Sequence, residues 1–115
     1  MKVKIISVAK QLPKYFRETK DIIPFVKLWM QNQDTRFQRK VIKLFEGAGV
    51  DKRYSIMDPE EVFIATSFEE KNNIYAREVV KLGEQSLKKA LDKANLKATD
   101  LDYIITVSCT GIMIP

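Results

Sequence analysis

The chain has 115 residues, of which 45% are hydrophobic and 30% charged, and this ordinary balance excludes an intrinsically disordered protein. Its single cysteine excludes an internal disulfide, and the lack of histidine argues against a structural zinc site. Twenty Lys and Arg against fifteen Asp and Glu give a net charge of +5, which favours an anionic partner such as nucleic acid, an acidic surface or a phosphorylated cofactor.

The apolar start of the chain has the pattern of a strand. The stretch MKVKIISVA is too short for a signal peptide and is followed at once by Lys10, and no run approaches the roughly 20 apolar residues that cross a bilayer. A soluble, cytoplasmic protein is therefore expected. The β-branched residues within 3–8 predict a short strand that ends before Pro13.

A first helix is predicted to open at Pro24, because proline is favoured at the first position of a helix. The spacing of Phe25, Leu28 and Trp29 places these side chains on one helical face.

A second helix is predicted to begin near Arg36 and to stop at the glycines of 47–49. Thr35 and Gln38 have the spacing of a capping box. One side of the helix is apolar, and an adjacent side is basic, with Arg36, Arg39, Lys40 and Lys43. The basic side has two interpretations, a solvated surface or a clamp for the phosphates of a nucleotide-like cofactor or a nucleic acid.

Two further helix starts are marked by capping residues. Asp58 followed by Pro59 predicts a short helix, and Ser67 with Glu70 forms a capping box ahead of a long one that ends near Asn95. The long helix carries a stripe of mostly small apolar residues that suits packing on a sheet: Ala76, Val79, Val80, Gly83, Leu87, Ala90, Leu91 and Ala94.

The last part of the chain predicts a central strand. The run LDYIITVSCTG, residues 101–111, is almost continuously apolar and rich in β-branched residues, as in strands covered on both faces. Cys109 lies where this strand meets a turn, a common place for ligands in α/β folds. A nucleophilic thiol needs a base such as histidine, which the chain lacks, so a small buried apolar role is the stronger interpretation.

Three segments together resemble the amino-terminal part of the type III polyketide synthases, the chalcone synthase group, and especially their bacterial members. They are GAGVDKRYS after the basic helix, SFEEKNNIYAREVVKLGEQSLKKAL, and DLDYIITVSCTGIMIP. The resemblance covers essentially the whole chain in order. The LDYII strand is shared with ketoacyl synthase III, whereas CTG with a proline four residues after its glycine is more particular to the type III group.

The resemblance implies an α/β, thiolase-like fold with αβαβα layers, of which residues 1–115 would supply an amino-terminal part of the first half. It also implies a homodimeric acyltransferase that loads an acyl group from coenzyme A onto a cysteine, assisted by a histidine and an asparagine. The acyl group is then extended by decarboxylative condensation with malonyl-CoA. Coenzyme A thioesters serve as substrates without a further cofactor, and neither nucleic acid nor a membrane is an expected partner.

The same resemblance implies roles for particular residues. Lys40 and Lys43 match two cationic positions that contact the phosphates of coenzyme A, while Gly47 stands at the third and departs from the pattern. Cys109 and Thr110 match residues that line the substrate pocket. Ile114 matches a position that reaches across the dimer interface. The family's nucleophile follows the CTG segment, so this chain alone is expected to be inactive.

Two alternatives remain open from the sequence. One is a sister enzyme, ketoacyl synthase III or hydroxymethylglutaryl-CoA synthase, which shares the fold and the thioester chemistry. The other is a non-catalytic module whose basic helix binds nucleic acid, a mode of binding that weakens steeply as salt rises.

Overall fold

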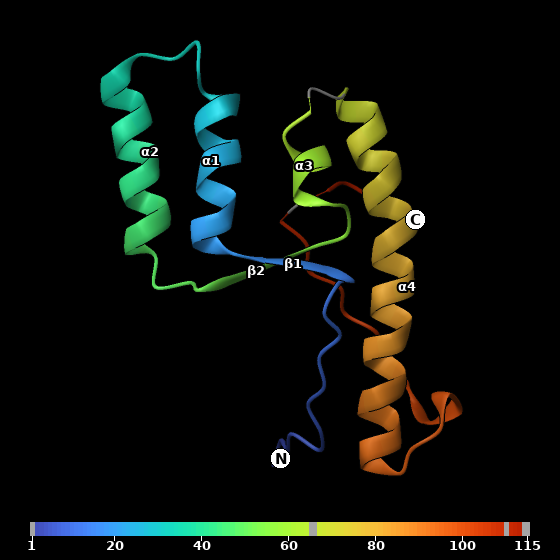
Figure 1. Ribbon diagram of the computed structural model, residues 1–115. Helices are drawn as coiled ribbons and strands as arrows, with labels where there is room; N and C mark the ends of the chain where they lie inside the picture. Colours follow the sequence, from blue (N-terminus) through green and yellow to red (C-terminus); the bar gives the residue numbers. More distant parts are fainter. Residues whose placement is uncertain (1, 65–66, 110, 114–115) are drawn as a thin grey trace. The chain divides into compact units, whose positions relative to one another are not determined.

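The computed structural model describes residues 2–64, 67–109 and 111–113 (Figure 1). The chain divides into two compact units, Pro13–Ala65 and the combination of Met1–Leu12 with Thr66–Pro115. The first unit contains β1 (Tyr15–Glu18), α1 (Thr19–Trp29), α2 (Thr35–Gly47), β2 (Lys52–Ser55) and α3 (Pro59–Val62). The second contains α4 (Phe68–Ala94) and a 3-10 turn at Ala98–Asp100.

The first unit is built on a two-stranded antiparallel sheet of β1 and β2. Phe16 lies opposite Tyr54, and their ring centroids are 5.8 Å apart. Aromatic pairs of this kind across neighbouring strands stabilise a short ribbon that backbone pairing alone holds weakly. Sequence reasoning predicted neither strand.

Helix α1 begins directly after β1, five residues before the predicted start at Pro24. Its first residue is buried and tied to the segment before β2: the Thr19 amide donates to the Asp51 carbonyl at 2.7 Å, and its hydroxyl donates to the Val50 carbonyl. Pro24 lies inside the helix on its exposed side, where it cannot donate a hydrogen bond to the Lys20 carbonyl one turn earlier.

The face of α1 that carries Phe25, Leu28 and Trp29 is not its buried face. Leu28 and Trp29 are 64% and 63% exposed. The buried positions follow one another at four-residue steps from the true start of the helix, and they form the core of the unit: Ile22, Val26 and Met30. The proline does not mark the start of the helix, because α1 begins at Thr19.

Helix α2 begins and ends close to the predicted residues, but its cap differs. Asp34, not Thr35, is the N-cap, and its carboxylate accepts from the amides of Arg36 and Phe37 at 2.9 and 3.0 Å. The Gln38 side chain does not close a capping box; it donates to the carbonyls of Met30 and Gln33 and so fastens the loop between the helices. Helices α1 and α2 lie side by side and antiparallel (Figure 1).

The other predicted helix starts are confirmed. Asp58 accepts from the Glu60 amide at 3.1 Å and caps α3. At the start of α4 the Ser67 hydroxyl accepts from the Glu70 amide at 3.1 Å, and the Glu70 carboxylate accepts from the Ser67 amide at 2.9 Å. Asn95 ends the helix in the left-handed conformation with φ of 55°.

The strands predicted at 3–8 and 101–111 are not formed. The described parts of both segments are without strand structure, and their β-branched side chains face solvent, with Val3 87% and Val107 93% exposed. A central strand needs neighbours on both edges, and no described residue pairs with either segment. The stripe of α4 is half-buried or exposed, and the described residues of its own unit form no strand.

None of the described helices is long and apolar enough to span a membrane.

Candidate functional site

The basic side of α2 carries the two predicted coenzyme A ligands. Lys40 and Lys43 are both exposed, one turn apart, and neither forms an ion pair with a described residue. Their ammonium groups are therefore available to an anion. A phosphate would meet two cations on adjacent turns without displacing an existing carboxylate partner.

The opposite side of α2 fixes the direction of these lysines. Val41, Ile42 and Phe45 pack against the core of the first unit. Since the partly buried residues and the basic residues lie on opposite sides of the helix, packing of one side holds the other toward solvent. The Asp34 cap holds the N-terminal end of the same helix.

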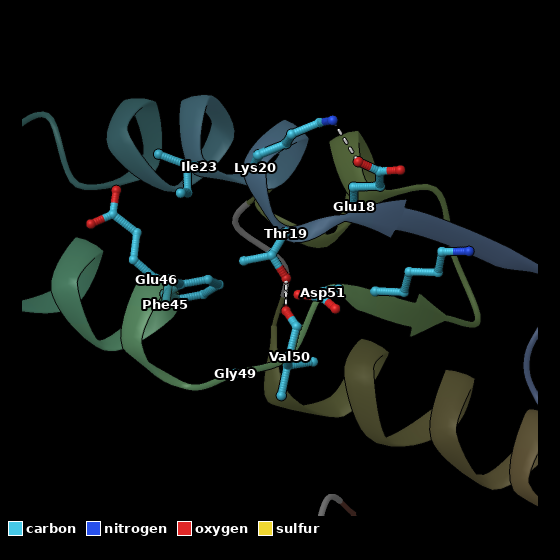
Figure 2. A pocket seen from close by; sticks show the side chains of 10 residues that line it. Glu18, Thr19, Lys20, Ile23, Phe45, Glu46, Gly49, Val50 and Asp51 are labelled. Carbon is cyan, nitrogen blue, oxygen red and sulfur yellow. Dashed lines mark hydrogen bonds and ion pairs between the residues drawn. The ribbon is translucent and has the colours of Figure 1, made fainter.

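A cavity of about 440 Å³ lies where α2 ends and β1 passes into α1 (Figure 2). Residues from β1, α1, α2, β2 and the loop before β2 line it: Glu18, Thr19, Lys20, Ile23, Phe45, Glu46, Gly49, Val50, Asp51 and Lys52. Neither Lys40 nor Lys43 lines this cavity, so it is distinct from the predicted phosphate site.

The lining of this cavity carries charges of both signs. Lys20 and Glu18 form an ion pair at 2.7 Å, drawn as a dashed line in Figure 2. The hydrogen bond from Lys20 lowers the pKa of Glu18, and the same bond raises the pKa of Lys20. Carboxylates outnumber ammonium groups in the lining, so the cavity is poorly suited to a phosphate.

Arg53 is a feature that sequence reasoning missed. Its guanidinium carbon lies 4.8 Å from the centroid of the Phe45 ring, which joins β2 to the last turn of α2. Its Nε is buried and has no hydrogen-bond partner among the described residues. Arg17, directly opposite on β1, pairs with Asp58 at 3.5 Å. No sequence pattern distinguishes this arginine from a surface cation.

In the second unit, the segment before the end of the chain forms a cavity of about 600 Å³ with α4. The Ile112 amide donates to Asn72 Oδ1 at 2.9 Å, which fastens the segment to the first half of α4. Mostly apolar residues line this cavity: Tyr75, Val79, Val80, Gly83, Thr106, Val107, Ser108, Gly111, Ile112 and Met113. An apolar hollow with a few hydroxyl groups suits an acyl chain better than a free anion.

The sequence-predicted residues of this segment are placed only in part. Cys109 is an exposed free thiol and does not line the cavity of about 600 Å³. Its role in a substrate pocket stays a prediction. Thr110 and Ile114 lie outside the described residues.

Comparison with curated proteins gives three named relatives, while no family model matches the chain. The chain is 40% identical over 74 residues to 1,3,6,8-tetrahydroxynaphthalene synthase of Streptomyces coelicolor, covering 64% of the chain and 20% of that enzyme. It is 31% identical over 75 residues to the enzyme of the same name from Streptomyces griseus, covering 65% and 20%. It is 26% identical over 73 residues to phloroglucinol synthase of Pseudomonas fluorescens, covering 64% and 21%.

The chain thus spans about a fifth of the length of the curated relatives it matches. A solved structure agrees with them: the tetrahydroxynaphthalene synthase of Streptomyces coelicolor A3(2), described as a bacterial type III polyketide synthase, superposes with a TM-score of 0.79. The match has 27% identity and covers 93% of this chain and 31% of that one, which confirms the predicted α/β, thiolase-like fold in part of its length. By sequence and by fold, the chain is similar to part of a bacterial type III polyketide synthase.

Proposed function

We propose that the chain is an amino-terminal part of an acyltransferase that extends an acyl-CoA starter with malonyl-CoA by decarboxylative condensation. The observation that carries this proposal is the structural match over 93% of the chain at 27% identity. The coenzyme A thioesters would be substrates, and the complete enzyme would act as a homodimer in the cytoplasm. Ile114 would lie at the interface between subunits.

Lys40 and Lys43 are proposed to bind the phosphates of the coenzyme A moiety. Their exposure, their spacing of one turn and their lack of described carboxylate partners support this role. Holding the phosphates orients the thioester, so the binding energy is used to position the reacting carbonyl. The two lysines would act in binding and take no part in proton transfer.

Cys109 and Thr110 are proposed to line the pocket for the growing acyl chain. The reaction itself requires a thiolate that attacks the starter thioester and releases coenzyme A. Malonyl-CoA then loses carbon dioxide, and its carbanion attacks the new thioester and frees the thiolate. Cys109 is an exposed free thiol, and the resemblance places the family's nucleophile after the CTG segment, so we assign the attacking thiol to a different cysteine of the complete enzyme.

Binding of coenzyme A to the 115-residue chain tests the role of the lysines. Isothermal titration should show that Lys40→Gln and Lys43→Gln each weaken binding about fivefold, the upper range for an exposed ion pair. Lys27→Gln, an exposed lysine on α1, is the matched control and should leave affinity unchanged. Equal affinity in all four proteins would remove the proposed site.

Labelling with a radioactive acyl-CoA tests the assignment of Cys109. No thioester should accumulate on the wild-type chain beyond that on Cys109→Ser, and malonyl-CoA should not be consumed. Stable label on Cys109 that passes to malonyl-CoA would make this cysteine the nucleophile and overturn the proposed division of roles.

A further inference from the structure

The basic side of α2 lacks a cation at Gly47, where the resemblance expects the third phosphate ligand. Gly47 is the last residue of α2, so the position itself is helical and only the side chain is missing. The question is whether another described cation completes the set. Two arginines of the same helix are candidates, Arg36 and Arg39.

Helical geometry separates the two candidates. At about 100° per residue, Arg36, Lys40 and Lys43 fall within a sector of about 60°, and the direction of position 47 lies inside that sector. Arg39 lies about 40° outside it, beyond Lys43. Arg36 to Lys43 spans about 10.5 Å along the axis, which equals the span from Lys40 to position 47.

The hydrogen bonds favour the same arginine. Arg39 Nε donates to the Thr35 carbonyl at 3.3 Å, so its guanidinium is partly engaged with its own helix. The Arg36 side chain is exposed and forms no ion pair with a described residue. The nearest carboxylate in sequence, Asp34, already accepts from the backbone amides of Arg36 and Phe37.

We propose that Arg36, Lys40 and Lys43 form a three-cation clamp for the phosphates of coenzyme A, displaced by one helical turn toward the start of α2. Arg36 thereby replaces the ligand missing at Gly47. This inference rests on the proposed function and adds to it the residue that completes phosphate binding.

The test compares four variants of the 115-residue chain by isothermal titration with coenzyme A. Arg36→Gln should weaken binding about fivefold, whereas Arg39→Gln, its matched control on the same helix, should stay within about twofold. The double variant Arg36→Gln/Gly47→Lys should recover affinity, because a Cβ at Gly47 meets no atom within 4 Å. Lys40→Gln reports on the proposed site itself, and circular dichroism checks that helix content is equal throughout.

The outcomes separate the two proposals. If Lys40→Gln weakens binding but Arg36→Gln and Arg39→Gln behave alike, the displaced clamp is wrong and the proposed function stands. If the wild-type chain does not bind coenzyme A, or Lys40→Gln has no effect, the proposed function fails and the clamp with it. If Arg36→Gln weakens coenzyme A binding and the added Gly47→Lys restores it, the displaced clamp is supported.

Discussion

Gly111 lies against the ring of Tyr75 so closely that a Cβ at position 111 would overlap three of the ring's carbon atoms. The neighbouring Ile112 amide donates to Asn72 at 2.9 Å, so backbone and ring contacts fasten the same short segment to α4. The closeness of the Tyr75 ring leaves no room for a side chain, which is a sufficient reason for glycine here. The glycine in CTG thus allows the chain to approach the helix.

Gly111→Ala should destabilise the second unit by about 1–3 kcal/mol, the usual cost of forcing a methyl group into a packed site. Urea unfolding followed by tyrosine fluorescence measures this change. Gly83→Ala is the matched control on α4, where a Cβ meets no atom within 4 Å. It should stabilise the helix by about 0.5–1 kcal/mol.

A second variant separates the ring contact from other effects of the methyl group. Gly111→Ala combined with Tyr75→Ala should lose less stability than the sum of the two single changes, because the overlap is gone. Strict additivity, or an unchanged stability in Gly111→Ala, would contradict the close approach.

The capping box of α4 should make stability depend on acid. Hydrogen bonds from the Ser67 amide and hydroxyl lower the pKa of Glu70 below its ordinary value of 4.5. A carboxylate whose pKa is lower in the folded state contributes stability above the unfolded value and loses it as pH falls through the folded value. The difference in melting temperature between wild type and Glu70→Gln should therefore shrink from pH 6 to below pH 4.

Glu69→Gln is the control for this acid dependence. Glu69 lies in the same first turn, but its side chain forms no hydrogen bond or ion pair with a described residue. Its substitution by glutamine removes one negative charge from the helix end and leaves the Ser67–Glu70 capping box intact. If the melting temperatures of Glu69→Gln and Glu70→Gln follow pH in the same way, the capping box is not the cause.

The local signals in the sequence were sufficient for most helix ends. Asp58 and Ser67 cap helices where predicted, and Gly47 ends α2, because each signal acts on backbone groups within a few residues. Helix α1 was misplaced because its start depends on Thr19 contacting Val50, far along the chain. A local pattern carries no information on such a contact.

Local sequence patterns were not sufficient to predict the strands. The pattern at 101–111 is that of a central strand, yet a strand forms only when other strands supply its hydrogen-bond partners. The residues of β1 and β2 are rich in charge, and their pairing depends on register between distant segments. Of the candidate site, the exposed lysines of α2 followed from helical spacing, whereas the stacking of Arg53 on Phe45 did not.

Met30 should be the most sensitive apolar residue of the first unit. It is 1% exposed and belongs to the core with Ile22 and Val26, so Met30→Ala leaves a cavity and should cost about 2 kcal/mol or more. Leu28→Ala, a change on α1 at a side chain 64% exposed, should cost about 0.5 kcal/mol or less. Urea unfolding followed by tryptophan fluorescence measures both, and similar costs would contradict the observed helix face.

Arg53 should contribute through its aliphatic stem and its contact with Phe45 more than through its charge. Its buried Nε has no described partner, and Arg17 places a like charge directly opposite on β1. Arg53→Met keeps the apolar contact with the ring. It also removes the unpaired buried Nε and the repulsion from Arg17, so the free energy of unfolding should stay within about 0.5 kcal/mol of wild type. Arg53→Ala removes the contact as well and should cost about 1–2 kcal/mol.

Arg53→Lys completes this series because lysine retains the charge without the planar guanidinium. If the charge above the Phe45 ring were the main contribution, Arg53→Lys would resemble wild type and Arg53→Met would be as unstable as Arg53→Ala. The expected order of stability is instead Met above Lys and Lys above Ala. Chemical unfolding at low and high salt also separates the two contributions. A packing contribution to stability does not change with ionic strength, whereas the repulsion between Arg53 and Arg17 is screened at high salt.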